Sequence, residues 1–345
     1  MTLPTILHLV DDASAGGVMR MLSHIETAPD FARFARHRVE VVSRSRIGAR
    51  REGADMIVSH LSVNWRNLPA LMTLRARHPG LPLVHVEHSY TEGFTALNVP
   101  RKGRFFTLLR TAYSLFDSVV AVSAGQADWM TRRGLVSADA LTVISPAVGL
   151  GAFTALRPVY HPPQVIGAIG RFDRQKGFDI LIAAFRKVEN PALRLRLIGD
   201  GPERAALQDL AAGDPRITFA GFAPDPAAAM AGVEAVAMPS RWEAYGLVSL
   251  EARAAGRPLL TARVDGLADH AAAGATAVSG QGVDAWAEAL RNLTDADAPV
   301  RIAVAEARAD AARAEARFAE SWSALVTALV SGGDAAQQRD LAQAA

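Results

Sequence analysis

The chain has 345 residues, of which half are hydrophobic, a formal net charge of +2 at pH 7 and no cysteine. Its length is enough for two hydrophobic cores of ordinary domain size, and the missing cysteine excludes disulfide frameworks, thiolate nucleophiles and cysteine-based metal sites. Residues 1–160 contain 18 Arg and Lys against 12 Asp and Glu, whereas residues 161–345 contain 19 against 23, so the N-terminal half either meets an anionic partner or has a solvated basic surface.

The N-terminus begins with a buried-strand pattern, Thr5–Val10, and not with a basic segment followed by a long apolar run. No signal peptide is therefore expected. No apolar run approaches the roughly 18–20 residues that span a bilayer. We expect a cytoplasmic protein, whose membrane contact, if any, is peripheral and at the inner face of the membrane.

Along the first half, short apolar runs rich in β-branched residues alternate with helical patterns. This alternation favours parallel sheets covered by helices on both faces. A proline-containing stretch with little periodicity, residues 149–164, is typical of a linker. Strands are predicted near residues 5–10, 38–43, 55–61, 82–88, 118–123 and 141–145.

The second half repeats this rhythm and then shows helical spacing over residues 300–330. The predicted fold class is α/β, with two Rossmann-like doubly wound domains, residues 1–155 and 156–330, and a disordered tail over residues 331–345. If the two sheets face each other, the carboxyl ends of their strands border a central cleft, where ligands of such folds bind. Strands of the second domain are predicted near residues 165–170, 194–198, 217–220, 234–238 and 258–262.

The segment from Pro239 to Ala252 contains candidate functional residues, because two carboxylates, Glu243 and Glu251, lie on either side of a predicted helix start. If the helix begins near Gly246, its first N–H groups and the positive end of its dipole can hold a phosphate. Glu243 then lies in the preceding loop, and Glu251 lies two turns into the helix, where it can accept hydrogen bonds from sugar hydroxyls. Taken alone, two such glutamates are more simply explained as solvated residues.

A second segment, from Ile169 to Asp179, contains a turn between a strand and a helix. Two cations, Arg171 and Lys176, flank this turn. A departing pyrophosphate needs concentrated positive charge, which an arginine fork and a lysine point charge supply without a metal. The alternative is a solvated basic turn.

Together these segments resemble the donor-binding half of retaining glycosyltransferases of family 4, whose GT-B fold has two Rossmann-like domains around a cleft. Glu243 and Glu251 match the family's Glu-x7-Glu pattern. Gly170-Arg171 and Lys176-Gly177 match its diphosphate-binding turn. The resemblance therefore covers both of the segments identified above.

The resemblance implies a role for each of these residues. Arg171 and Lys176 would bind the donor diphosphate, Glu243 would contact the transferred sugar, and Glu251 would hold the ribose. Loops over residues 197–202 and 219–222 would lie against the nucleoside. The other donor-binding residues would then be Gly199, Phe222, Gly246, Leu247 and Val248.

The N-terminal half resembles the family less closely. A glycine pair after the first strand, Gly16-Gly17, resembles the family's loop where the backbone approaches the donor phosphates. His60 and His88 each end a strand and resemble histidines of the acceptor side; His88 is expected near the transferred sugar, whereas His60 is equally well a structural residue. Ser123 resembles a residue of an acceptor-side turn and is alternatively a helix N-cap.

Residues 100–116 combine basic side chains with apolar and aromatic ones. Such a mixture suits a surface helix that rests on anionic lipid, as related enzymes often do to reach lipid-linked acceptors. The alternative is an amphipathic helix whose apolar face joins the protein core.

We therefore expect a retaining glycosyltransferase that moves a sugar from a UDP- or GDP-sugar to the hydroxyl of a sugar or lipid-linked acceptor, in polysaccharide or glycolipid assembly. Neither a cofactor nor a metal nor a nucleic acid partner is expected. Ala244 and Tyr245 are mild departures from the family, which often has Pro and Phe there. Asp269 stands where the family has Glu, which leaves the sugar contacts at this position open.

Other functions also use Rossmann-like domains. A nicotinamide-dependent oxidoreductase is opposed by the sequence, since neither Gly16-Gly17 nor residues 167–170 supply a Gly-x-Gly-x-x-Gly turn. A nucleotide-sugar epimerase or a sugar phosphorylase of similar fold stays open. A non-catalytic nucleotide-binding module is disfavoured by the cationic turn and the two-glutamate helix start.

Overall fold

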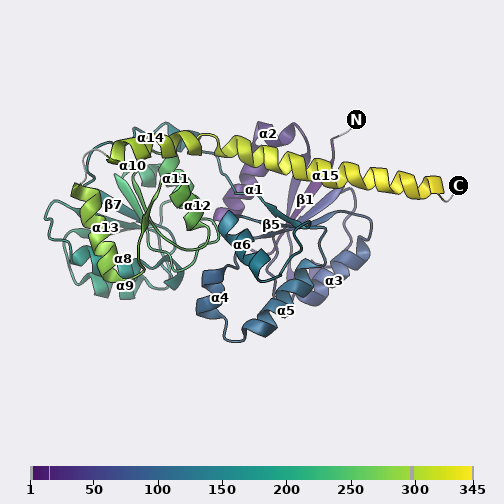
Figure 1. Cartoon of the computed structure of the whole chain (residues 1–345), viewed down its shortest axis with the longest axis horizontal. Helices are drawn as coiled ribbons and strands as arrows, with labels where there is room; N and C mark the ends of the chain where they lie inside the picture. The colour runs from purple at the N-terminus through teal and green to yellow at the C-terminus, as the bar shows by residue number, and fades with distance from the viewer. Residues whose placement is uncertain (1–2, 15, 296–298, 344–345) are drawn as a thin grey trace. The chain divides into compact units, whose positions relative to one another are not determined.

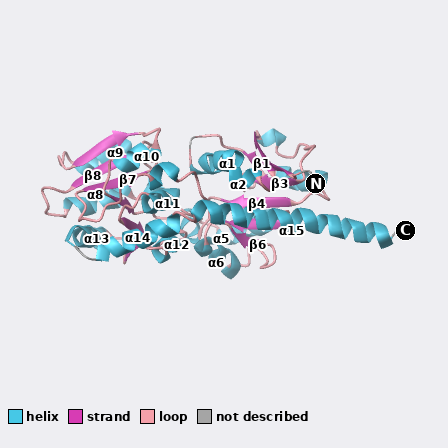
Figure 2. Cartoon of the chain, turned by 90° about the horizontal axis from the view of Figure 1, so that it is seen from above, coloured by secondary structure: helices cyan, strands magenta, loops and turns pink. Residues whose placement is uncertain are grey.

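The computed structural model of the chain describes residues 3–14, 16–295 and 299–343. Its contacts divide the chain into two compact units, and each unit is a parallel β-sheet flanked by helices (Figure 1, Figure 2). The N-terminal unit consists of Met1–Tyr90, Thr95–Val148 and Glu315–Ala345, and the C-terminal unit consists of Thr91–Phe94 and Gly149–Ala314.

The N-terminal unit has a sheet of six parallel strands. These are β1 (Thr5–Val10), β2 (Arg36–Val41), β3 (Met56–Ser59), β4 (Leu83–Glu87), β5 (Ser118–Ala121) and β6 (Leu141–Val143). Their order in the sheet is β2-β1-β3-β4-β5-β6. Strands β3 to β5 are buried throughout, and apolar residues predominate in β3 and β5, whereas β4 also buries His85 and Glu87. The accompanying helices are α1 (Gly17–Thr27), α2 (Pro29–Ala32), α3 (Leu68–Arg77), α4 (Glu92–Asn98), α5 (Lys102–Tyr113), α6 (Ala124–Arg132) and α15 (Ala314–Gln343).

The C-terminal unit has a second sheet of six parallel strands. These are β7 (Val165–Ile169), β8 (Arg194–Ile198), β9 (Ile217–Gly221), β10 (Ala235–Met238), β11 (Leu259–Ala262) and β12 (Thr276–Val278). Their order is β12-β11-β10-β7-β8-β9. The accompanying helices are α7 (Gly151–Thr154), α8 (Phe178–Arg186), α9 (Arg204–Ala211), α10 (Pro226–Ala231), α11 (Leu247–Ala254), α12 (Leu267–Ala272), α13 (Val283–Asp295) and α14 (Pro299–Ala311).

In each sheet the chain reverses the direction in which it adds strands. The reversal lies between β1 and β3 in the first sheet and between β7 and β10 in the second. Ligands of doubly wound folds bind outside the carboxyl ends of the strands at such a reversal. The loops that follow these four strands are therefore the places to look for a site.

The predicted strands are confirmed, with ends shifted by at most two residues. One strand, β12, was not predicted, because a run of three residues is too short for its periodicity to be read from the sequence.

The end of the chain differs from the prediction. Instead of one helix over residues 300–330 and a disordered tail, the structure has α14 followed by α15, which continues through Gln343 (Figure 1). Phe318 and Trp322 of α15 are buried, and the ring of Phe318 contacts that of Phe31 in α2. Periodicity indicates an amphipathic helix but does not identify the surface on which its apolar face packs.

The division into units also differs in detail from the predicted domains, 1–155 and 156–330. The main change of unit falls between Val148 and Gly149, and the chain returns to the N-terminal unit at Glu315. A short segment, Thr91–Phe94, belongs to the C-terminal unit. The return of the chain to the N-terminal unit depends on tertiary contacts, and the amino-acid composition of a linker does not reveal these contacts.

Candidate active site

Two loops lie at the strand reversal of the C-terminal unit. The first connects β7 to α8, and the second connects β10 to α11. They touch at Gly177, which has a positive φ of +66°, and a Cβ atom there would lie 2.2 Å from the carbonyl oxygen of Pro239. Only glycine fits this position, because it accepts both the left-handed backbone and the close approach. The two loops are thus held together by backbone geometry.

An ion pair joins the same two loops. The Lys176 Nζ lies 2.6 Å from the Glu243 Oε2, and the hydroxyl of Ser240 donates to this same oxygen at 3.3 Å. Both charged side chains are largely buried, with 17% and 11% of their surface exposed. An ammonium group has three N–H donors, so its contact with Glu243 leaves donors for a second anion. The predicted residues Lys176 and Glu243 are therefore brought together.

A second ion pair braces this arrangement. The Arg241 guanidinium donates to both carboxylate oxygens of Asp179 at 2.8 and 2.6 Å, and the Arg241 backbone N–H donates to the Gln175 carbonyl at 2.7 Å. Partial burial alone would raise the pKa of Asp179, but the charge and hydrogen bonds of Arg241 hold this pKa below its usual range. The start of α8 is thereby fixed against the loop that precedes α11.

Helix α11 begins beside the ion pair. Gly246, its N-cap, has a φ of +92°, and a Cβ atom there would lie 3.2 Å from the Glu243 Cγ. Leu247 and Val248 are the first helical residues, so their N–H groups have no partner within the helix. Glu251, on the second turn, is buried with 1% of its surface exposed. The N-terminus of α11, Lys176 and Glu243 therefore lie close together, and Glu251 lies further along the same helix.

The remaining predicted donor residues follow β7, β8 and β9. Arg171 is exposed. Gly199 has a φ of +147°, and a Cβ atom there would lie 1.9 Å from the Gly170 carbonyl oxygen, so the loop after β8 touches the start of the cationic turn. Phe222 is 65% exposed. Arg171 and Phe222 thus present free surface, whereas Gly199 serves loop packing.

Asp265 is a residue of this site that the sequence analysis missed. Its carboxylate accepts hydrogen bonds from the Thr91 hydroxyl at 2.7 Å and from the N–H groups of Gly93 at 3.0 Å and Glu243 at 3.2 Å. Burial raises its pKa despite these bonds. Its φ is +40°, a value that is rare for a residue other than glycine. Residues with such backbone angles cluster at functional sites. The Asp-Gly pair after β11 indicates a tight turn in the sequence and could have identified Asp265, whereas the sequence analysis considered Asp269.

Replacing Asp265 by Ala is expected to destabilise the C-terminal unit by about 3 kcal/mol or more. Three part-buried donors would lose their acceptor, and alanine is disfavoured at a positive φ. Urea unfolding of the purified variant measures this loss. Asp265→Asn is the matched control, because asparagine keeps a carbonyl acceptor and tolerates the left-handed backbone. Equal stability of the two variants would contradict this account of Asp265.

In the N-terminal unit, the predicted residues after β1, β3 and β4 are also found at strand ends. Gly16 is the N-cap of α1, and Gly17 is its first residue. His60 and His88 line a cavity of about 80 Å³. The Nδ1 of His60 lies 2.8 Å from the Nε2 of His88, and their rings are stacked. The two histidines form one polar group at the cavity wall.

A buried carboxylate shapes the loop that carries His88. Glu87 accepts hydrogen bonds from the N–H groups of Ser89 at 2.7 Å and Tyr90 at 2.9 Å, and from the Tyr113 hydroxyl at 2.8 Å. Burial alone would raise the pKa of Glu87, but the neighbouring His85 and the backbone donors lower it. Glu87 is therefore an anion that holds the loop after β4 in place.

Ser123 is the N-cap of α6. Its hydroxyl accepts a hydrogen bond from the Gln126 N–H at 3.1 Å, and its side chain is fully buried. The N-cap interpretation is thus confirmed. Any acceptor contact of Ser123 stays a prediction.

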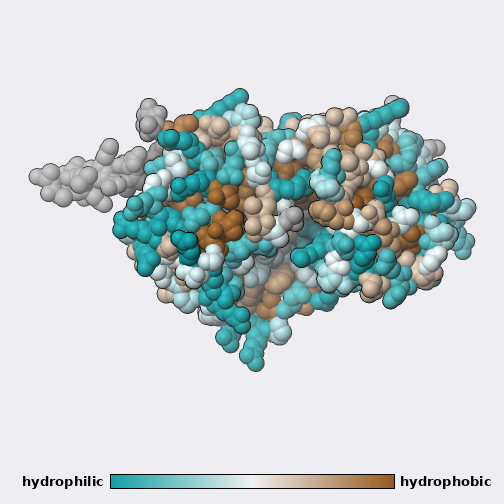
Figure 3. All heavy atoms as spheres, turned by 180° about the vertical axis from the view of Figure 1, so that it is seen from behind, coloured by the Kyte–Doolittle hydropathy of each residue, from teal (hydrophilic) through white to brown (hydrophobic). Residues whose placement is uncertain are grey.

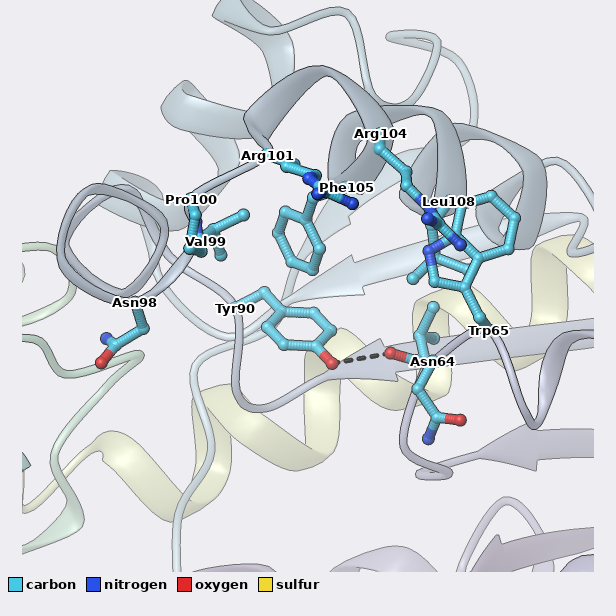
Figure 4. A pocket seen from close by; sticks show the side chains of 11 residues that line it. Asn64, Trp65, Tyr90, Asn98, Val99, Pro100, Arg101, Arg104, Phe105 and Leu108 are labelled. Atoms are coloured by element: carbon cyan, nitrogen blue, oxygen red, sulfur yellow. Dashed lines mark hydrogen bonds between the residues drawn. The ribbon is translucent and has the colours of Figure 1, made fainter.

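A larger pocket of about 580 Å³ adjoins the histidine cavity, since Val63 and Tyr90 line both. The Tyr90 hydroxyl donates to the Val63 carbonyl at 2.6 Å, which fixes the ring in the pocket wall (Figure 4). The Arg104 guanidinium lies over the ring of Trp65, 5.2 Å from its centroid. Aromatic rings and guanidinium groups therefore line one pocket. Its wall is formed by Val63, Asn64, Trp65, Tyr90, Asn98, Val99, Pro100, Arg101, Arg104, Phe105 and Leu108.

The apolar face of helix α5 packs in the core of the N-terminal unit, and the first turns of the helix line the larger pocket. Leu108, Leu109 and Tyr113 are buried in the core, as the second interpretation of residues 100–116 expected. The face shown in Figure 3 is a mosaic of hydrophilic residues and small groups of hydrophobic ones. Among the described residues, no helix combines the length and the apolar character needed to cross a bilayer.

Family profiles match both halves of the chain. The profile described as Glycosyltransferase Family 4 matches residues 14–151, and the profile described as Glycosyl transferases group 1 matches residues 163–296. Together they include every residue predicted for the donor and acceptor sides.

Characterised proteins of similar sequence carry glycosyltransferase names. The chain is 31% identical over 299 residues to D-inositol 3-phosphate glycosyltransferase of Stackebrandtia nassauensis, covering 77% of this chain and 66% of that protein. It is 30% identical over 223 residues to a glycogen synthase of Mycobacterium tuberculosis, covering 61% of this chain and 52% of that protein. The chain thus spans only about half of the length of the glycogen synthase.

Solved structures share the fold. Anabaena HepE, solved in complex with UDP-glucose, superposes with a TM-score of 0.73 at 18% identity, covering 94% of this chain and all of that one. Sucrose-phosphate synthase from Thermosynechococcus elongatus superposes with a TM-score of 0.68 at 21% identity, covering 99% of this chain and all of that one. The predicted fold class is confirmed by the two parallel sheets and these likenesses, and the profile matches show that the chain belongs to the family 4 type of glycosyltransferases with the GT-B fold.

Proposed function

We propose that the chain transfers a sugar from a nucleoside diphosphate sugar to an acceptor hydroxyl, with retention at the anomeric carbon. The observation that carries this proposal is the meeting of Lys176, Glu243 and the N-terminus of α11 in one unit. A lysine with spare donors and a helix N-terminus are suited to two negatively charged phosphates. The neighbouring glutamate suits sugar hydroxyls or a ring that develops positive charge.

The reaction breaks the bond between the anomeric carbon and the leaving phosphate oxygen and forms a bond to the acceptor oxygen. The acceptor proton passes to the departing diphosphate on the same face of the sugar. Negative charge grows on the diphosphate as its bond breaks, so Lys176, Arg171 and the dipole of α11 stabilise the transition state more than the ground state. Glu243 contacts the transferred sugar, and Glu251 holds the ribose.

The lining of the larger pocket in the N-terminal unit is suited to binding an acceptor that combines an anionic group with a ring or an apolar part. Trp65, Tyr90 and Phe105 offer stacking surfaces, and Arg101 and Arg104 offer positive charge. The adjoining cavity with His60 and His88 then receives the reacting hydroxyl. A phosphorylated sugar alcohol or a lipid-linked phosphate has this chemistry. If the acceptor is a lipid-linked phosphate, residues 100–116 would contact the cytoplasmic face of the membrane.

No metal is part of this proposal, because Lys176 and Arg171, together with the dipole of α11, are assigned the task of neutralising the diphosphate. Turnover is therefore expected to be unchanged by a molar excess of EDTA over added divalent cations, with dialysed enzyme as the reference. Loss of turnover with EDTA, restored by Mg²⁺ or Mn²⁺, would contradict this part of the mechanism.

A donor screen tests the proposed function. Purified protein is melted with UDP, GDP and ADP and their glucose, mannose and N-acetylglucosamine derivatives, because a ligand that prefers the native state raises the melting temperature. The stabilising donor is then incubated with sugar and sugar-phosphate acceptors, and the anomeric proton is followed by NMR. A glycoside with the anomeric configuration of the donor supports the proposal.

The same experiment separates the alternatives. An altered sugar on an intact nucleotide indicates an epimerase, and a sugar phosphate released by inorganic phosphate indicates a phosphorylase. Binding without any turnover across the panel indicates a nucleotide-binding module. Each of these three results would contradict sugar transfer.

A further inference from the structure

Four histidines form a continuous hydrogen-bonded row across the N-terminal sheet. The Nδ1 of His37 lies 3.1 Å from the Nε2 of His8, and the Nδ1 of His8 lies 3.0 Å from the Nε2 of His60. The Nδ1 of His60 in turn lies 2.8 Å from the Nε2 of His88. The row follows the strand order β2-β1-β3-β4. Only its last two members line the cavity assigned to substrate, so the first two need another explanation.

The rings of this row are neutral at physiological pH. Burial lowers the pKa of His37 to about 4 and that of His88 to about 4, the second against the opposing charge of Glu87. Burial and the neighbouring imidazoles lower the pKa of His8 and of His60 well below the usual value. A positive charge on any of these four rings is therefore unfavourable, and the row does not act as a chain of imidazolium ions.

Neutral rings in a row cannot choose their tautomers independently. A neutral imidazole has one N–H donor and one acceptor nitrogen, and each hydrogen bond between two rings needs one proton. When all three bonds are formed, every ring must therefore carry its proton on the same type of nitrogen. The row has only two states, one with Nδ1–H throughout and one with Nε2–H throughout.

The far end of the row decides between these states. The Nε2 of His37 is buried and has no hydrogen-bond partner among the described residues. The rings of Phe31 and Phe34 pack beside it, with centroids 5.5 and 5.6 Å away. Protonation of this nitrogen would bury a donor without an acceptor, and buried N–H groups without a partner are rare. The state with Nδ1–H on every ring avoids this.

We propose that His8 and His37 are positioning residues, which hold the proton of His88 on Nδ1 by keeping the four imidazoles in one shared tautomer. His88 then presents a hydrogen-bond donor, and not an acceptor, at its remaining ring nitrogen. If the proposed sugar transfer is correct, His88 donates to an oxygen of the substrate and does not serve as a general base. Neither His8 nor His37 touches the substrate cavity.

A pair of nearly isosteric variants, His37→Asp and His37→Asn, tests this proposal. The carboxylate introduced by His37→Asp can only accept a hydrogen bond from His8, whereas the amide introduced by His37→Asn can donate one as His37 does. The probe is ¹⁵N NMR of histidine-labelled protein, in which the two ring nitrogens report the tautomer directly, and thermal unfolding confirms that each variant is folded.

The wild type and His37→Asn are expected to show His88 protonated on Nδ1, and His37→Asp is expected to show it protonated on Nε2. An Nε2–H tautomer of His88 in the wild type would overturn the proposal even if neither variant folds. An unchanged tautomer in folded His37→Asp would overturn it as well.

Turnover of the donor found in the screen supplies a second readout. The kcat of His37→Asp is expected to fall about tenfold with little change in KM for the donor, while His37→Asn stays near wild type. A switched tautomer with unchanged kcat would overturn the positioning role. If the wild type turns over no nucleotide sugar, the proposed function fails, but the tautomer measurement remains decisive for the row.

Discussion

Replacing Lys176 by Ala is expected to lower kcat/KM for nucleotide-sugar turnover by about 100-fold. The ammonium group pairs with Glu243, whose side chain borders the N-cap of α11, and the proposed function assigns the leaving diphosphate to this place. Removal of one such donor from a preorganised site commonly has this effect. Steady-state rates at limiting donor measure the change. Arg171→Ala is expected to act in the same direction but less strongly, because Arg171 is exposed.

The chain offers a matched control for this variant. Lys187 belongs to the same unit and also makes a 2.6 Å ion pair, with Asp284, but both side chains are exposed. Lys187→Ala is therefore expected to keep wild-type kinetics. Lys176→Ala leaves Glu243 without its cation, so unfolding must be measured alongside. Wild-type kcat/KM in a folded Lys176→Ala protein would remove Lys176 from the diphosphate site.

The protein is expected to lose much of its stability on acidification from pH 6.5 towards about pH 4, because buried imidazoles must gain protons. An unfolded histidine titrates near pH 6.5, so below this pH the unfolded chain binds more protons than the folded protein, and the free energy of unfolding falls. Each histidine contributes a slope of up to about 1.4 kcal/mol per pH unit until its folded pKa is reached. The histidines with lowered pKa are His8, His24, His37, His60, His88 and His270.

Several such histidines together can offset the whole stability of a typical domain, about 5–15 kcal/mol. Urea unfolding at half-unit steps of pH measures the slope. His270 allows the C-terminal unit to be tested separately, because its pKa is lowered to about 3 by burial and its Nε2 lies 3.1 Å from the Tyr245 carbonyl. His270→Gln keeps a donor for that carbonyl and should lessen the acid sensitivity. A free energy of unfolding that stays constant from pH 6.5 to pH 5 would contradict this account.

Much of the architecture could be predicted from the sequence because parallel strands leave a strong local signal. Buried strands such as β5 and β10 appear as short apolar runs, and the glycine at residue 177 marks a turn that no other residue fits. Lys176 and Glu243 were each predicted to lie in a loop after a strand, and the strand order brings these two loops together, although their ion pair was not predicted. These are consequences of local pattern together with topology.

Other features depend on contacts between distant parts of the chain. Asp265 binds donors from Thr91 and Gly93, more than 170 positions earlier in the sequence, and no local pattern connects them. The packing of Phe318 in the N-terminal unit is equally non-local. The histidine row requires the strand order, since His37 lies in β2 and His88 directly follows β4, and only the folded sheet aligns these strands. Sequence periodicity carries no information on such partners.

The most direct test of the diphosphate site is a calorimetric titration of UDP and UMP into the wild type and Lys176→Ala. The two ligands differ by the β-phosphate, which is the group assigned to Lys176 and the N-terminus of α11. The account predicts that the substitution weakens UDP binding at least about tenfold more than UMP binding, as loss of one charge-assisted contact would. Equal effects on the two nucleotides, or no effect on either, would contradict it.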